Sequence, residues 1–278
     1  MARKDLLKRT VVGAVLVAVI VTGLVIFPPV LPYLVLVAVY MMMREFYGFS
    51  IGRDYPVQQA LAIGAVALSF AMVYLVKCYG IGCRCLAFAV IPYFAMLVSV
   101  LFKKDRSSLD NLPYVFTGVL YIGIPSALLP LLLFKQGGYD GMLMLSIMVI
   151  IWFSDIAAYI FGTAFGQKPT SRKLAPAISP KKSWIGFWSG LVFGAGAAAL
   201  MYALGAMILP LVHCMLLGVL ISAAGVCGDL FESVWKRRFG VKDSGNSIPG
   251  HGGFLDRFDS TLFAIPAAIV YLAVFNLL

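Results

Sequence analysis

The feature that most constrains this chain is a series of long apolar stretches joined by short polar segments. Only 12% of its 278 residues are charged, whereas 62% are hydrophobic. A helix needs about 20 mostly apolar residues to cross the hydrocarbon layer of a membrane. We therefore predict an all-α polytopic membrane protein with about nine transmembrane helices, near residues 10–27, 30–49, 57–76, 85–102, 112–134, 142–164, 184–209, 211–231 and 258–277.

The basic residues are distributed unevenly between the predicted loops. The net charge of +10 is compatible with a nucleic-acid partner. When successive loops are assigned to alternate sides of the membrane, however, all 22 lysines and arginines except Lys77, Arg84 and Lys135 fall on the N-terminal side. Cytoplasmic loops carry such an excess of positive charge. We therefore predict a cytoplasmic N-terminus, contacts with membrane lipids and no nucleic-acid partner.

The acidic residues indicate two functional parts. Residues 1–139, with about five predicted helices, hold almost no ionisable group inside a span, and we expect them to form an N-terminal transmembrane scaffold. Residues 140–278, with about four helices and two basic cytoplasmic loops, are expected to be the catalytic part. A carboxylate at membrane depth is costly and usually marks function. Five such acids lie here: Asp155, Asp229, Glu232, Asp256 and Asp259.

Four of these acids form two pairs with helical spacing. Asp229 and Glu232 are three residues apart, as are Asp256 and Asp259, so each pair lies on one face of a helix. If the two faces meet, their oxygen donors suit magnesium better than zinc. The alternative is a set of structural ion pairs with Lys236, Arg237 or Arg257. For Asp155 three roles stay open: metal ligand, supporting acid, or partner of a lysine.

Two segments offer hydrogen-bond donors to phosphate groups. In "IPGHGGF" three glycines and a proline precede a predicted helix, where backbone amides can bind an anion. In "SPKKS" two lysines and two serines precede the helix expected to begin at Trp184. Such a group suits the phosphate of a nucleotide and that of a lipid equally well.

These segments resemble the signature of phosphatidate cytidylyltransferases, also called CDP-diacylglycerol synthases. The stretch "SVWKRRFGVKDSGNSIPGHGGFLDRFDS" carries the family's fixed positions as Ser233, Lys236, Arg237, Lys242, Asp243, Pro249, His251, Gly252, Gly253, Asp256, Arg257 and Asp259. The stretches "SDIAAYIFGTAFG" and "KLAPAISPKKSW" resemble further family segments in the expected order. The resemblance is strong over about 150–278 and is one of hydropathy only before that. Ile185 departs from the pattern, because family members commonly have glutamate there.

The resemblance implies an enzyme that transfers the cytidylyl group of CTP to phosphatidic acid, giving CDP-diacylglycerol and pyrophosphate. It also implies a magnesium cofactor with a monovalent cation such as K⁺ beside it, a homodimer, and a bacterial inner membrane with the active site facing the cytoplasm. The lipid phosphate is itself the nucleophile, which agrees with the lack of a G-x-S-x-G elbow or a Walker A loop in the sequence.

Each candidate residue receives a predicted role. We expect a catalytic function for Asp229, Lys236, Lys242, Asp243, His251, Arg257 and Asp259. We expect substrate phosphate to be bound by Ser179, Lys181, Lys182, Ser183, Arg237, Gly252 and Gly253. The expected metal ligands are Asp229 and Asp256.

Two other functions remain open at this point. A CTP-dependent lipid kinase acting on polyprenol would need a base for the hydroxyl group, for which Asp243 is available, and would release CDP instead of pyrophosphate. An ion-coupled transporter could use buried acids, but it usually has interrupted helices in two related halves. Here the acids belong to one half of the chain.

Overall fold

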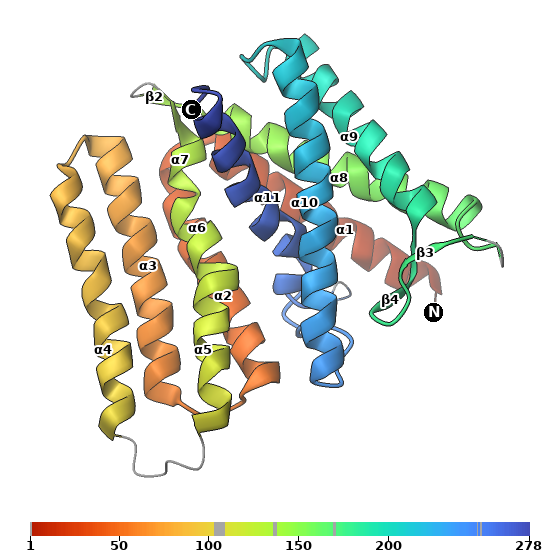
Figure 1. Ribbon diagram of the computed structural model, residues 1–278. Coiled ribbons are helices and arrows are strands. Elements are labelled where there is room, and N and C mark those ends of the chain that lie inside the picture. Colours follow the sequence, from red (N-terminus) through yellow and green to blue (C-terminus); the bar gives the residue numbers. More distant parts are fainter. Residues whose placement is uncertain (1, 103–108, 136–137, 169–170, 249, 251) are drawn as a thin grey trace. The chain divides into compact units, whose positions relative to one another are not determined.

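The structure is a computed structural model that describes residues 2–102, 109–135, 138–168, 171–248, 250 and 252–278. It is built almost entirely from helices (Figure 1). In these residues eight helices are long and apolar enough to cross a membrane, and a shorter apolar helix covers Thr10–Ile26. The prediction of an all-α polytopic membrane protein is therefore confirmed. The location of the N-terminus in the cytoplasm stays a prediction.

The chain divides into two compact units. Unit 1 comprises Met1–Tyr139 and Asp243–Arg257, and unit 2 comprises Asp140–Lys242 and Phe258–Leu278. The segment Asp243–Arg257, which holds most of the glycine-rich part of the signature, thus belongs to unit 1. We refer to it below as the signature loop. The division into a scaffold and a catalytic part is a statement about function and stays a prediction.

Unit 1 contains the first five apolar segments. The fifth of them, Leu109–Leu133, changes from α-helical to π-helical geometry over Val119–Gly123, just before Pro125. Proline has no amide hydrogen for the helical hydrogen bond at that position. The helices and strands of unit 1 are α1 (Ala2–Val21), α2 (Leu31–Ser50), α3 (Pro56–Tyr79), α4 (Ile91–Ser99), α5 (Leu112–Gly118), α6 (Ile124–Leu128), α7 (Pro130–Leu133), and the paired strands β1 (Phe134–Lys135) and β2 (Gly138–Tyr139).

Helix α2 is held firmly in the core of unit 1. Phe46 and Tyr47 are both fully buried, and the hydroxyl group of Tyr47 donates a hydrogen bond to the backbone carbonyl of Val115 at 2.9 Å. Helix α2 also packs against α3 and α5. The C-terminal half of α2, which includes Glu45, therefore has a fixed position among its neighbours in unit 1.

Unit 2 contains the last four apolar segments. Helices α8 (Gly141–Ala164), α9 (Trp184–Ala203) and α10 (Leu211–Arg238) pack against one another (Figure 1). Helix α11 (Leu255–Val274) begins in unit 1 and continues in unit 2. Between α8 and α9 the chain forms an antiparallel hairpin of β3 (Lys173–Ala175) and β4 (Ser179–Ser183), which the sequence analysis did not predict.

Helix α10 extends beyond the apolar stretch that predicted it. The hydropathy pattern ends near residue 231, whereas the helix ends at Arg238. Its last turn carries Lys236, Arg237 and Arg238, and cations at a helix C-terminus are favoured by the helix dipole. The extension places the first basic residues of the signature on a regular helix.

Candidate active site

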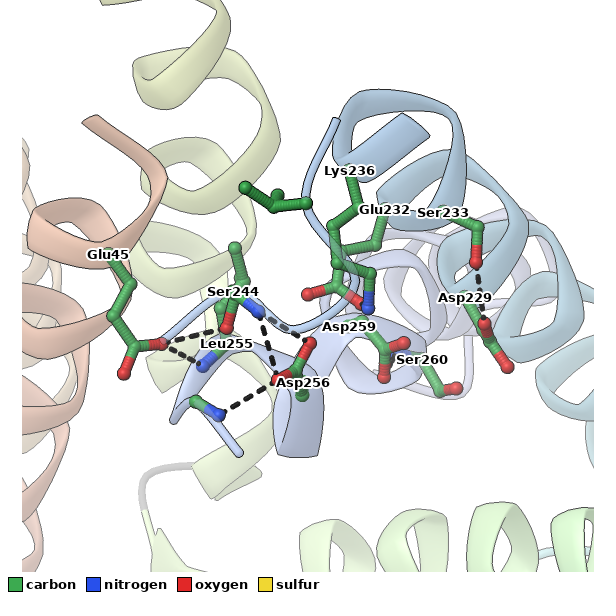
Figure 2. A network of polar contacts seen from close by, with 12 residues as sticks. Glu45, Asp229, Glu232, Ser233, Lys236, Ser244, Leu255, Asp256, Asp259 and Ser260 are labelled. Carbon is green, nitrogen blue, oxygen red and sulfur yellow. Dashed lines mark hydrogen bonds and ion pairs between the residues drawn. The ribbon is translucent and has the colours of Figure 1, made fainter. Parts of the chain in front are cut away.

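Lys182 of β4 and Asp229 of α10 form an ion pair. The Nζ atom of Lys182 lies 2.8 Å from Oδ2 of Asp229, and the two side chains are 23% and 41% exposed. The other oxygen of Asp229, Oδ1, accepts a hydrogen bond from the Ser233 hydroxyl at 3.4 Å (Figure 2). The "SPKKS" segment therefore contacts α10 within unit 2, one turn before the signature begins at Ser233.

Three carboxylates of unit 2 lie close enough to interact electrostatically. Asp155 of α8 interacts with Asp229 and Lys182, and Asp259 of α11 interacts with Asp229, Asp155 and Lys236. Helices α10 and α11 approach so closely at Gly228 that a Cβ atom there would overlap the backbone carbonyl of Asp259. Carboxylates repel one another, so a cluster of this kind is favoured by cations among them.

Glu232 and Lys236, one turn apart on α10, form a buried ion pair. The distance from Nζ to Oε2 is 2.6 Å, and the side chains are 1% exposed for Glu232 and 12% for Lys236. This is the structural ion pair that the sequence analysis weighed against a metal-binding role for these acids. The carboxylate of Glu232 thus has a partner on its own helix.

In unit 1 the carboxylate of Asp256 closes the signature loop. Its two oxygens accept hydrogen bonds from the backbone amide of Ser244 at 3.2 and 3.1 Å, and Oδ2 accepts another from the amide of Gly253 at 2.8 Å (Figure 2). Gly252 has a positive φ of 81°, a conformation that favours glycine. Asp256 therefore organises the loop that precedes its own helix.

Glu45 of α2 contacts the same loop. Its carboxylate accepts hydrogen bonds from the backbone amide of Leu255 at 2.8 Å and from the hydroxyl group of Ser244 at 3.0 Å (Figure 2). It accepts a third from the backbone amide of Phe254 at 2.8 Å. Glu45 is not among the site residues predicted from the sequence. The signal was present, because Glu45 is an acid inside the second apolar stretch, and such acids usually mark function.

Comparison with known proteins identifies the family. A model described as the cytidylyltransferase family matches residues 7–275. The chain belongs to the cytidylyltransferase family. Proteins named phosphatidate cytidylyltransferase match it in Bacillus subtilis (43% identity over 128 residues, 46% of each chain) and in Staphylococcus haemolyticus (37% over 174 residues, 62% of this chain and 64% of the relative). In Pseudomonas aeruginosa the identity is 43% over 146 residues, 51% of this chain and 52% of the relative. The chain thus spans about half to just under two thirds of the length of these curated relatives.

The remaining candidate residues occupy three places in the chain. Ser179 and the exposed Lys181 lie on β4, and the buried Ser183 caps α9, where its Oγ accepts a hydrogen bond from the amide of Gly186 at 3.2 Å. Arg237 is exposed at the end of α10. Lys242, Asp243 and Arg257 are exposed in or beside the signature loop. His251 lies outside the described residues, and the predicted roles of all these residues stay predictions.

The carboxylates described above are chemically suited to magnesium. Mg²⁺ is usually held by one or two protein carboxylates together with substrate phosphates and waters. Asp229 meets this requirement, because its carboxylate is partly exposed and its ion-pair partner Lys182 can also bind phosphate. In the described part of the chain, no three or more His, Cys, Asp and Glu side chains are grouped to hold a metal ion. Coordination of one ion by Asp229 and Asp256 stays a prediction.

Proposed function

We propose that this chain is a phosphatidate cytidylyltransferase, which makes CDP-diacylglycerol and pyrophosphate from CTP and phosphatidic acid. The observation that carries the proposal is the ion pair between Lys182 and Asp229. It joins the "SPKKS" segment, which resembles the phosphatidate cytidylyltransferase pattern, to Asp229 of α10, one turn before the signature begins at Ser233. The chain as a whole belongs to the cytidylyltransferase family. Curated relatives with 36–43% identity carry that name.

The proposed reaction needs no nucleophile from the protein. An oxygen of the lipid phosphate attacks the α-phosphorus of CTP. The bond from that phosphorus to the oxygen bridging the α- and β-phosphates breaks, and pyrophosphate leaves with the bridging oxygen. The protein has to align two polyanions and to stabilise the negative charge that develops on the leaving group.

Lys182 is suited to this task because it is a cation next to a carboxylate in the resting protein. We propose that Lys182 moves from Asp229 to a phosphate oxygen when substrate binds. Asp229 and Asp256 are the proposed ligands of magnesium, with K⁺ as a second cation. Bound magnesium would supply Lewis acidity that stabilises charge on the phosphate oxygens.

The other candidate residues complete the proposal. Lys181, Lys236, Arg237, Lys242 and Arg257 would donate hydrogen bonds to the triphosphate or the lipid head group, together with the amides of the signature loop. Because CTP is cytoplasmic, the active site would face the cytoplasm from a bacterial inner membrane, and the enzyme would act as a homodimer.

The experiment that tests this function follows the two ends of CTP. The purified protein in lipid nanodiscs receives phosphatidic acid, magnesium and CTP labelled on either the α- or the γ-phosphate. We expect the α-label to enter the lipid and the γ-label to leave as pyrophosphate. Transfer of the γ-label to an added polyprenol, with release of CDP, would establish the lipid kinase instead. No transfer of either label would overturn the proposal.

A further inference from the structure

We infer that Glu45 is a positioning residue for the proposed cytidylyl transfer, because its carboxylate holds the signature loop and the first turn of α11 in place. The inference rests on the proposed function. Glu45 comes from α2, outside the stretches that carry the family resemblance in the sequence analysis. Its partners Ser244, Phe254 and Leu255 all lie in the signature loop.

The contacts made by Glu45 are of the strong kind. The first amides of a helix have no partner within the helix, and negative charge is favoured at that end. A carboxylate that accepts hydrogen bonds from backbone amides gains about twice the stabilisation of a neutral acceptor. Glu45 therefore acts as an N-terminal cap of α11 that another helix supplies.

The signature loop is shaped around this carboxylate. A Cβ atom at Gly245 would lie 2.9 Å from Oε1 and 3.0 Å from Cδ of Glu45. A Cβ atom at Gly253 would lie 2.6 Å from Oε2. Side chains at these two positions would thus push the carboxylate away. Around it Ser244 and Leu255 are buried, with 6% and 0% of their surface exposed.

Glu45 and Asp256 hold the loop at shared residues. The hydroxyl group of Ser244 donates to Glu45, and the amide of Ser244 donates to Asp256. Asp256, a proposed metal ligand, directly follows Leu255, whose amide donates to Glu45. Loss of the Glu45 contacts would therefore displace Asp256 without removing any group that touches substrate. Small displacements of reacting groups reduce rates strongly.

The test uses Glu45→Gln in the full chain in nanodiscs, with Asp110→Asn as the matched control. Gln has nearly the same shape, but it replaces one acceptor oxygen with an NH₂ donor, so an amide hydrogen of the loop would face another donor. Asp110 is an exposed acid of unit 1 and has no assigned role. Two quantities are measured: hydrogen exchange in peptides covering 243–260, and kcat and KM for CTP.

We expect Glu45→Gln to raise the exchange rate of those peptides by about tenfold or more, since a hydrogen bond to a charged group is lost. We expect kcat to fall by a similar factor, while peptides from α3 and α8 exchange as in the wild type. Asp110→Asn should change neither quantity. Ser244→Ala removes one of the three donors and keeps both amide bonds, so it should give smaller changes of the same kind.

Unchanged exchange at 243–260 in Glu45→Gln would overturn the inference, and so would faster exchange with an unchanged kcat. If Glu45→Gln does not fold, Ser244→Ala decides, and wild-type exchange and kcat in that variant would overturn the inference. If the wild type itself shows no transfer from CTP to phosphatidic acid, the proposed function fails. The exchange rates then still decide whether Glu45 holds the loop.

Discussion

The Nζ atom of Lys182 lies 2.8 Å from Oδ2 of Asp229, so a β-hairpin and a membrane-spanning helix share one ion pair. This pair differs from the one between Glu232 and Lys236. The latter joins residues one turn apart on a single helix, and its carboxylate is 1% exposed. Asp229, at 41% exposure, is accessible to a second cation. The two acids share a helical face but have different surroundings, and this difference leads to separate predictions.

Lys182→Met should lower the rate of CTP-dependent pyrophosphate release by about 100-fold, because a preorganised charge at a transition state contributes about that much. Lys168→Met is the matched control, since Lys168 is an exposed cation between α8 and β3 with no assigned role. It should keep the wild-type rate.

The double variant Lys182→Met with Asp229→Asn should have almost the same rate as the slower of the two single variants, because the effects of mutating residues that act as a unit are not additive. Fully additive losses would contradict a shared role.

Asp256→Asn should abolish magnesium-dependent turnover while the protein still elutes as a folded species in detergent. The change removes the charge that the metal would need, and the NH₂ group of the new asparagine would face the amides of Ser244 and Gly253. Turnover is measured over a range of magnesium concentrations. The exposed acid Asp54, changed to Asn, serves as control. Full activity of Asp256→Asn would disprove its assignment as a metal ligand.

Lys236→Met should lower the free energy of unfolding by about 3–5 kcal/mol, because it leaves the buried carboxylate of Glu232 without its charge partner. The double variant with Glu232→Gln should recover most of that stability. Thermal unfolding in detergent measures both effects. If Lys236 also binds phosphate, the stable double variant will remain slow. Wild-type turnover in that double variant would show that the pair is only structural.

Gly245→Ala should loosen the signature loop, because the new Cβ atom would lie 2.9 Å from the carboxylate of Glu45. We expect activity to fall by about tenfold, the loss expected for one hydrogen bond to a charged group. Gly48→Ala is the matched control, since Gly48 lies on α2 with nothing within 4 Å of a Cβ atom there. Alanine at 48 should raise stability by about 0.5–1 kcal/mol. Equal activities of the two variants would contradict the account of the loop.

The spans were predictable from sequence because a membrane leaves little choice of structure. Backbone groups in lipid must be paired within their own segment, so an apolar stretch of sufficient length becomes a helix. The stretch at 142–164, for example, is helix Gly141–Ala164. The helix ends were less predictable: α10 continues to Arg238, because polar residues can extend a helix beyond the lipid.

The roles of individual acids were less accessible to sequence reasoning. The spacing of Asp229 and Glu232 places both on one face of α10, but it does not determine which cation pairs with each carboxylate. Glu45 could have been noticed as an acid inside an apolar stretch, but its partners could not be predicted, because Phe254 and Leu255 follow some two hundred residues later in the chain. Contacts of such long range leave no local pattern.

By itself the amino-acid sequence determined the membrane-spanning helical class and the resemblance to a cytidylyltransferase signature, because hydropathy and short motifs are local properties of a chain. Only the tertiary structure decided that Asp229 pairs with Lys182, that Glu232 pairs with Lys236, and that Glu45 binds the signature loop. The physical reason is that the partner of a buried or half-buried charge is set by which elements pack beside it.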